Sequence, residues 1–411
     1  MKTKTKVAAI LENAILIDLS VFIIFAPFSK HAVKTAFWIA VVLWVLISIV
    51  KFGAKFCKHL IPATPLNKAL LFFFSALIVS TVFSKDFGHS QSVFFERYLV
   101  YLIFFLIGSR LAGKRRNLFI LTGAFFLGSL LIGTGMIWDY IHLSGDRFLY
   151  TCFGRGFHVA FYLVLYICLS SAIVFFAENK LLKAGGLMIL LLLLPGLIFH
   201  ASRTAWITVL AMILVMSFIK NRKLLLCLFA ALITGILLLS PLLKQRLPLL
   251  GERAVAIFDP VTWRGGEAWG GRIELWETAL AIFRDFPVFG AGPGMYEKLL
   301  YEYGPAGGYP YGGVHLHAHN SYLEIASELG AVGFLAFLWI FTVFFRNAFK
   351  SIRLLQDNNI MAIRTGMTGS VLGILMVAMA CTLMTVGMQD AAVFWFLLGM
   401  ASQTLYITVY E

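Results

Sequence analysis

The sequence predicts an all-α polytopic membrane protein with about twelve transmembrane helices and one large, partly helical loop. Hydrophobic residues fill 60% of the 411 positions and charged residues only 13%, whereas soluble domains average about 25% charged residues. The mean hydropathy is +0.87. The apolar residues also lie in repeated runs of roughly 20 residues, which is the length that crosses a bilayer as a helix.

About twelve such runs follow one another along the chain. The first lacks the small-residue cleavage site of a signal peptide, so we expect it to be a membrane helix. Only Ala201, Ser202 and Arg203 separate the seventh run from the eighth, which predicts a tight turn there. The runs lie near Ala8 to Phe28, Thr35 to Val50, Asn67 to Ser84, Val93 to Ala112, Leu118 to Ile141, Phe157 to Glu178, Ala184 to His200, Thr204 to Ile219, Leu224 to Leu243, Gly330 to Phe345, Thr365 to Met388 and Val393 to Tyr410.

The formal net charge of +14 is explained by membrane topology and requires no nucleic-acid partner. Cytoplasmic loops of membrane proteins collect Lys and Arg. If both termini are cytoplasmic, the inside loops receive Lys2, Lys4, Lys6, Lys51, Lys55, Lys58, Lys68, Arg110, Lys114, Arg115, Arg116, Lys180, Lys183, Lys220, Arg222, Lys223, Arg346, Lys350, Arg353 and Arg364. The short outside loops hold far fewer basic residues, and this asymmetry supports the orientation.

We expect residues 1–411 to form a single integral membrane domain, with one long outside loop at 244–318 between the ninth and tenth spans. A loop of this length usually has a function. Apolar residues recur at helical spacing from Arg272 to Phe286, which predicts a helix with one apolar face. A turn should follow it, because Pro and Gly then dominate, at Pro287, Gly290, Gly292, Pro293 and Gly294.

The stretch from Val314 to Gly333 concentrates the most chemically useful groups. Ser321 and Glu324 fit the capping-box pattern, which predicts that a short helix starts there and then enters the membrane. His319 would lie at the N-terminus of that helix. Such an end carries unpaired N–H groups and partial positive charge, so it suits an anion such as phosphate. A neutral imidazole beside it can accept a proton.

Two arginines are expected at the same side of the membrane, and each has an ordinary alternative role. Arg203 follows the turn between the seventh and eighth spans, where an arginine often extends to the membrane surface. Arg272 starts the loop helix, where pairing with Glu274 or Glu277 would account for it. Arginine also binds phosphate through two parallel hydrogen bonds. Together with a helix N-terminus, the two arginines would form a pyrophosphate site.

The histidines permit a second interpretation, a metal site. His315, His317 and His319 alternate, and alternate residues of an extended segment point to the same side. No cysteine, Asp cluster or Asp-x-Asp motif completes such a site, and the five cysteines show no CxxC spacing. We therefore expect chemistry without a metal or cofactor. His319 could also be a capping or interfacial histidine, and Glu324 and Glu328 helix-surface or capping carboxylates.

The motifs resemble those of a known superfamily. His319-Asn320, followed after nine residues by Gly330-Ala331-Val332-Gly333, is similar to the His-Asn…Gly-x-x-Gly signature of O-antigen ligases and polymerases, a superfamily that includes O-linked protein oligosaccharyltransferases. Ser202-Arg203-Thr204 resembles its arginine at the outer end of a helix. The segment from Arg272 to Gly294 is similar to its large periplasmic loop. The order and common side of these short motifs make the resemblance fairly specific.

The resemblance implies a glycosyltransferase at the periplasmic face of the bacterial inner membrane. Its donor would be an undecaprenyl-pyrophosphate-linked glycan, and its acceptor a sugar of the lipid A core. Arg203 and Arg272 would bind the pyrophosphate and stabilise the leaving group, and His319 would deprotonate the acceptor hydroxyl. His317 and Asn320 are further candidates for substrate binding. A single displacement would invert the anomeric centre. His315 and His317 resemble the His-x-His run of ligase sequences, and the specific roles of both stay open.

Several activities are compatible with these features. The ligase is favoured over the polymerase and the protein-directed enzymes by the length of the chain, the placement of the loop and the His-x-His-x-His-Asn run. A transporter is the alternative from another class, because about twelve spans are typical of one. Transporters place ionisable groups near the bilayer midplane, where Asp18 is the main acid of this chain. The polar residues cluster at one surface instead, which favours surface chemistry.

Overall fold

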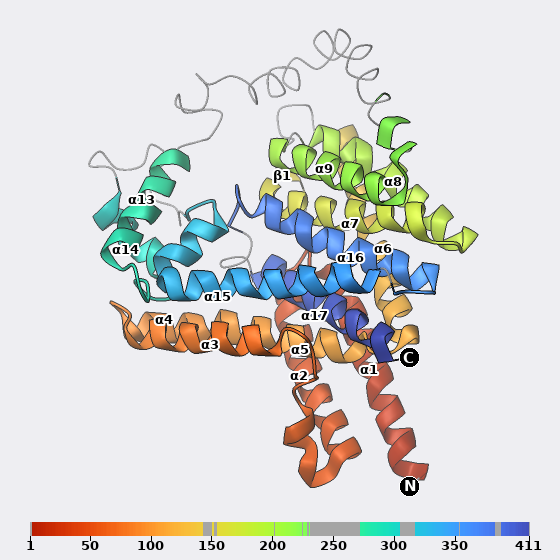
Figure 1. Cartoon of the computed structure of the whole chain (residues 1–411), viewed down its shortest axis with the longest axis horizontal. Coiled ribbons are helices and arrows are strands. Elements are labelled where there is room, and N and C mark those ends of the chain that lie inside the picture. The colour runs from red at the N-terminus through yellow and green to blue at the C-terminus, as the bar shows by residue number, and fades with distance from the viewer. Residues whose placement is uncertain are drawn as a thin grey trace.

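The computed structural model describes residues 2–142, 150–151, 154–200, 202–223, 225–227, 230, 272–304, 317–352, 354–382 and 388–410. Within these ranges the protein is a bundle of helices with a pair of loop helices at one end (Figure 1). The first half contains α1 (Lys2–Phe25), α2 (Lys30–Phe52), η1 (Gly53–His59), α3 (Asn67–Val82), α4 (Phe87–Val93), η2 (Phe94–Tyr98), α5 (Leu99–Leu111) and α6 (Arg115–His142). The second half contains β1 (Tyr150–Thr151), β2 (Gly154–Arg155), α7 (Gly156–Phe176), α8 (Lys180–Phe199), α9 (Arg203–Lys220), α13 (Arg272–Asp285), α14 (Met295–Tyr303), α15 (Ser321–Ile352), α16 (Asn358–Val377) and α17 (Met388–Tyr410).

The predicted class, an all-α polytopic membrane protein, is confirmed. Among the described residues, nine helical segments are long and apolar enough to cross a membrane, and α3 is a shorter apolar helix. The two strands are only two residues each and pair antiparallel. The predicted ninth span, Leu224 to Leu243, lies largely outside the described residues, so the total of about twelve stays a prediction.

Several predicted spans have different limits in the structure, and three of them show why. The fourth starts earlier, because α4, the π-helical segment η2 and α5 run on without a break from Phe87. The tenth starts at Ser321, since α15 continues through a kink at Gly330. The eleventh was predicted to end at Met388 but α16 ends at Val377. Ala378, Ala380 and Cys381 follow Val377 in a buried non-helical segment, so hydropathy alone could not place the end of the helix.

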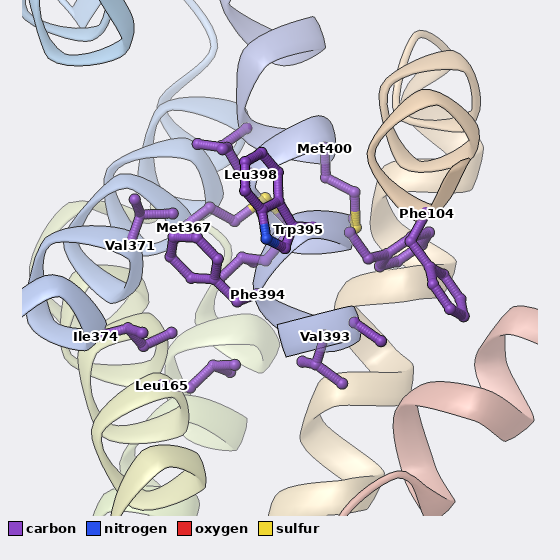
Figure 2. Packing of buried hydrophobic residues seen from close by; sticks show 14 of the residues in the cluster. Phe104, Leu165, Met367, Val371, Ile374, Val393, Phe394, Trp395, Leu398 and Met400 are labelled. Carbon is purple, nitrogen blue, oxygen red and sulfur yellow. The ribbon is translucent and has the colours of Figure 1, made fainter. Parts of the chain in front are cut away.

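Apolar packing fills the centre of the bundle, where α5, α7, α16 and α17 meet. Figure 2 shows Phe104 of α5, Leu165 of α7, Ile374 of α16 and Phe394 of α17 around this centre. Glycine allows the closest approach. A Cβ on Gly399 of α17 would overlap the backbone of α5. The centre therefore depends on shape and apolar contact, as close-packed interiors do.

Antiparallel packing places several helix ends together. Gly366 and Gly373 of α16 lie beside Leu169 and Val164 of α7, so α7 begins where α16 ends. In the same way α9 runs antiparallel to α16, because Thr208 lies beside Gly373 and Met216 beside Gly369.

We call the end of the bundle that carries α13 and α14 the loop face. Figure 1 shows the start of α1 and the end of α17 far from these two helices.

The other end, here called the opposite face, carries exposed ion pairs. Arg115 Nη2 lies 2.7 Å from Asp357 Oδ2, which joins the start of α6 to the start of α16. Lys114 Nζ lies 2.6 Å from Glu12 Oε2 of α1. Lys114 and Arg115 belong to the basic clusters that the sequence predicts for one side of the membrane. The structure thus separates them from the loop face.

Candidate functional site

Asn320 starts α15, and the predicted capping box is wrong. The Asn320 Oδ1 atom accepts hydrogen bonds from Tyr322 N (3.0 Å) and Leu323 N (3.2 Å), which makes Asn320 the N-cap. Ser321 does not cap the helix, because its Oγ donates to the Cys381 carbonyl at 3.0 Å. Glu324 reaches back past the cap and accepts from Ala318 N at 3.2 Å. These two bonds connect the start of α15 to Cys381 and to Ala318.

His319 occupies the residue before this cap in a left-handed conformation, with φ of 47°. Such a conformation is uncommon for a residue other than glycine and persists where surrounding bonds enforce it. Glu324 fixes the preceding residues: besides Ala318 N, its Oε1 lies 4.0 Å from His317 Nδ1. Asn320 fixes the following ones. The backbone therefore turns at His319, which is held between two anchored segments.

The end of α16 and the segment after it are hydrogen-bonded to the start of α15. Ser321 N donates to the Ala378 carbonyl at 2.9 Å, in addition to the bond from Ser321 Oγ to Cys381. The Tyr322 hydroxyl donates to the Leu375 carbonyl at 2.9 Å. These bonds attach the first turn of α15 to the end of α16. They place His319 on the loop face.

Arg272, the first residue of α13, lies close to His319. Burial, the nearby positive charge of Arg272 and His317 together lower the pKa of the His319 imidazole from 6.5 to about 4, and burial is the largest of these causes. Burial also lowers the pKa of the Arg272 guanidinium, while Cys381 counteracts this change. At neutral pH the imidazole is thus uncharged and sits beside a cation. This pair could bind an anion and accept a proton.

Arg203 lies on the same face of the bundle, at the first turn of α9. Ser202 is the N-cap of α9, and its Oγ accepts from Ala205 N at 3.4 Å. The described residues on either side of Ala201 agree with the predicted tight turn: α8 ends at Phe199, α9 begins at Arg203, and Trp206 Nε1 donates to the Leu197 carbonyl at 2.7 Å. Because α9 begins where α16 ends, Arg203 shares the loop face with Arg272 and His319. A common cavity that includes all three stays a prediction.

Comparison with known families addresses the same region. Residues 187–338 match the family described as O-Antigen ligase. The match supports assigning the chain to the O-antigen ligase family. It includes Arg203, Arg272, His317, His319 and Asn320. No curated protein sequence matches the chain.

The O-antigen ligase family comprises membrane glycosyltransferase-like enzymes, so the match supports an enzyme in coarse terms. The structure brings four of the predicted site residues together: His317, His319 and Asn320 before α15, and Arg272 from α13. Within the described ranges, no three His, Cys, Asp or Glu side chains are grouped to hold a metal ion. His315 and most of the predicted loop 244–318 lie outside those ranges.

One pair of polar residues on this face was not predicted. His158 Nδ1 of α7 is hydrogen-bonded to Asp390 Oδ2 of α17, and the Asp390 side chain is only 1% exposed. The sequence signal for this pair is the acidic Asp390 at the start of a helix. Its partner His158 lies 232 residues away in the chain, so the sequence does not show that the two meet. Glu324 and Glu328, expected as helix-surface or capping carboxylates, are buried at 1% and 3% exposure, so the helix-surface alternative is wrong. Both accept bonds from backbone N–H groups, Glu324 from Ala318 and Glu328 from Tyr296 at the start of α14.

Proposed function

We propose that this member of the O-antigen ligase family transfers glycan from undecaprenyl pyrophosphate to a sugar hydroxyl of the lipid A core. The reaction would take place at the periplasmic side of the bacterial inner membrane, with both termini in the cytoplasm. The observation that carries the proposal is a neutral, half-buried His319 beside the cationic Arg272 at the start of a membrane helix. Both residues lie in the segment that matches the family.

Arg272 would bind the donor pyrophosphate, with Arg203 as a second cation from α9. A half-buried guanidinium binds phosphate oxygens through two parallel hydrogen bonds and keeps its charge at any physiological pH. Negative charge grows on the pyrophosphate as it leaves the sugar. Cations already in place stabilise that charge without reorganisation. Asn320 and His317 would contact the sugar or phosphate next to His319.

His319 would act as the general base. It takes the proton of the acceptor hydroxyl, the oxygen attacks the anomeric carbon, and the bond from that carbon to the pyrophosphate oxygen breaks. Undecaprenyl pyrophosphate leaves with the electron pair, and the anomeric configuration inverts. A pKa of about 4 makes free His319 a weak base. The bound pyrophosphate would neutralise Arg272 and raise that pKa, so the imidazole becomes a stronger base only when the donor is present.

Other acceptors are possible within the superfamily, and a transporter remains the alternative from another class. A polymerase would use a second lipid-linked glycan as acceptor, and a protein oligosaccharyltransferase a Ser or Thr hydroxyl. The donor and the residues at the site would be the same in each case. The gathering of Arg272, His317, His319 and Asn320 at one face favours transfer over transport, because a transporter needs its site near the bilayer midplane.

The test is a transfer assay with purified protein in lipid nanodiscs. The donor is an undecaprenyl-pyrophosphate-linked glycan, and separate reactions contain lipid A core, a second lipid-linked glycan or a Ser/Thr peptide. Glycan attached to lipid A core supports the ligase. Product with another acceptor alone replaces the ligase by that activity. No transfer to any acceptor, together with solute flux in proteoliposomes, would overturn the proposal in favour of transport.

A further inference from the structure

Glu328, a buried carboxylate in the third turn of α15, caps a different helix. Its Oε1 accepts a hydrogen bond from Tyr296 N, in the first turn of α14, at 3.2 Å. The N-cap of α14 is Gly294, which has no side chain that could accept such a bond. A carboxylate is the best partner for the free N–H groups and partial positive charge of a helix start. Glu328 thus supplies from α15 the cap that α14 lacks.

Tyr296 continues this connection to α13. Its hydroxyl donates to the Leu275 carbonyl at 2.9 Å, and the side chain is only 1% exposed. Leu275 lies three residues after Arg272, so the bond holds the first turn of α13 at a fixed distance from α14. Leu275 and Tyr296 also belong to one small apolar cluster that joins α13, α14 and Ala318. The path therefore runs from α15 through α14 to the residue that faces His319.

We propose that Glu328 and Tyr296 are positioning residues that hold Arg272 against His319 through their two hydrogen bonds. The path starts and ends on the same segment, because Glu328 lies in α15 and His319 directly before it. At one end of the path the charge of Arg272 acts on His319, and at the other Tyr296 N is hydrogen-bonded to Glu328. An effect of these two residues on the rate of glycan transfer rests on the proposed function. Their effect on the position of Arg272 relative to His319 does not.

A separate set of backbone bonds keeps α13 and α14 attached when this path is cut. At the kink of α15, Ala331 N donates to the Pro287 carbonyl (2.8 Å) and Val332 N to the Val288 carbonyl (3.2 Å). In return, the carbonyls of Ser327 and Glu328 accept from the turn, from Ala291 N (3.0 Å) and Gly292 N (2.9 Å). We call these four bonds the glycine junction. Removing one side-chain bond should shift the first turn of α13 without detaching it.

The protonation of His319 reports this shift directly. Among the described residues, the charged or titratable groups around the imidazole include Arg272 of α13, His317, Glu324 of α15 and, next to Arg272, Cys381. Arg272 is the strongest of the charges that disfavour the imidazolium. If Arg272 moves away, the imidazole will bind a proton at higher pH. A substitution that only weakens packing at α14 would not change this property.

The test measures carbethoxylation of His319 by diethyl pyrocarbonate, which reacts with neutral imidazole, from about pH 3 to 8 so that both sides of the midpoint are covered. Mass spectrometry of the His319 peptide quantifies the adduct in purified protein without substrate. In Tyr296→Phe we expect the midpoint to rise by roughly half a unit or more, toward the effect of Arg272→Ala. The control Tyr301→Phe removes a hydroxyl from the same helix at a 76% exposed position and should change nothing.

Two variants of Glu328 complete the test. Glu328→Ala should raise the midpoint as Tyr296→Phe does, whereas Glu328→Gln keeps an oxygen that accepts from Tyr296 N and should stay near the wild type. An unchanged midpoint in both Tyr296→Phe and Glu328→Ala, with helicity retained, would overturn the positioning role. A raised midpoint with slower glycan transfer supports it. A raised midpoint with unchanged transfer also supports the positioning role, but counts against the catalytic function of His319.

Discussion

At the centre of the bundle, α7 and α16 contact each other through apolar side chains and glycines, whereas at the loop face α14 is attached by charged and backbone groups. Lys298 Nζ lies 2.6 Å from Asp86 Oδ2, and Lys85 Nζ lies 3.1 Å from Glu302 Oε1. Ser90 Oγ donates to the Pro293 carbonyl at 2.9 Å. Apolar contact depends on volume and tolerates many side chains, while hydrogen bonds fix direction as well as distance.

The two regions therefore have separate roles. The centre supplies most of the buried apolar surface, and with it the stability of the fold. The loop face adds little apolar area but determines where Arg272 and His319 lie. Substitutions at the loop face should reduce activity and spare the melting temperature. Substitutions at the centre should do the reverse.

The largest effect should come from His319→Ala, a change at the loop face. Loss of a positioned general base should slow glycan transfer by about 10²- to 10⁴-fold, because proton removal then depends on water. The melting temperature should stay close to that of the wild type. Initial rates with saturating donor and acceptor measure the effect, with the exposed His31→Ala as control. A rate within a few fold of the wild type would remove His319 from the mechanism.

Gly330→Ala tests the glycine junction. Gly330 has φ of 65° and ψ of −169°, and a Cβ there would overlap the backbone of Val288. The strain should be of order 1–3 kcal/mol, so the turn at Pro287 should detach part of the time and transfer should slow by about tenfold. Limited proteolysis near residues 287–294 reports the detachment. Gly123→Ala, at an exposed position with free space around it, should behave like the wild type.

The pH dependence should differ between the free protein and the complex. Because burial and Arg272 lower the pKa of His319 to about 4, the neutral base persists down to that pH and kcat/KM should fall only as pH drops through about 4. The bound pyrophosphate raises the pKa, so kcat should begin to fall at a higher pH. Initial rates from about pH 3 to 8 separate the two profiles. Coinciding acid limbs would show that the donor does not bind beside His319.

Phe104→Leu should have the smallest effect on transfer and a clear effect on stability. Phe104 is fully buried in α5 and stacks on Phe22 of α1 with ring centroids 4.6 Å apart. The shorter side chain should cost about 1 kcal/mol and lower the melting temperature. Transfer at a temperature well below melting should stay within about twofold of the wild type. A strong loss of transfer in folded protein would mean that the two regions are coupled.

Hydropathy in the sequence predicts the membrane helices well because their apolar length is a local property. It also places the helix that begins at Arg272, whose apolar face repeats every turn. The residue pattern of a capping box, in contrast, is misleading for Ser321 and Glu324, because their side chains bond to the backbone of Cys381 and Ala318. The sequence gives no sign of the path through Glu328 and Tyr296. Tyr296 lies 32 residues from Glu328 and 21 residues from Leu275 in the chain, so these residues meet only after folding.

The central claim is that Arg272, brought beside His319 by α13, binds the donor pyrophosphate. The most direct measurement is the Kd of undecaprenyl pyrophosphate, without glycan, for wild-type protein and two variants in nanodiscs. Arg272→Ala should weaken binding by at least about tenfold, because a half-buried cation contributes more than a kcal/mol to phosphate binding. Arg284→Ala, at the exposed end of the same helix, should bind like the wild type. Equal affinity of the wild type and Arg272→Ala would contradict the claim.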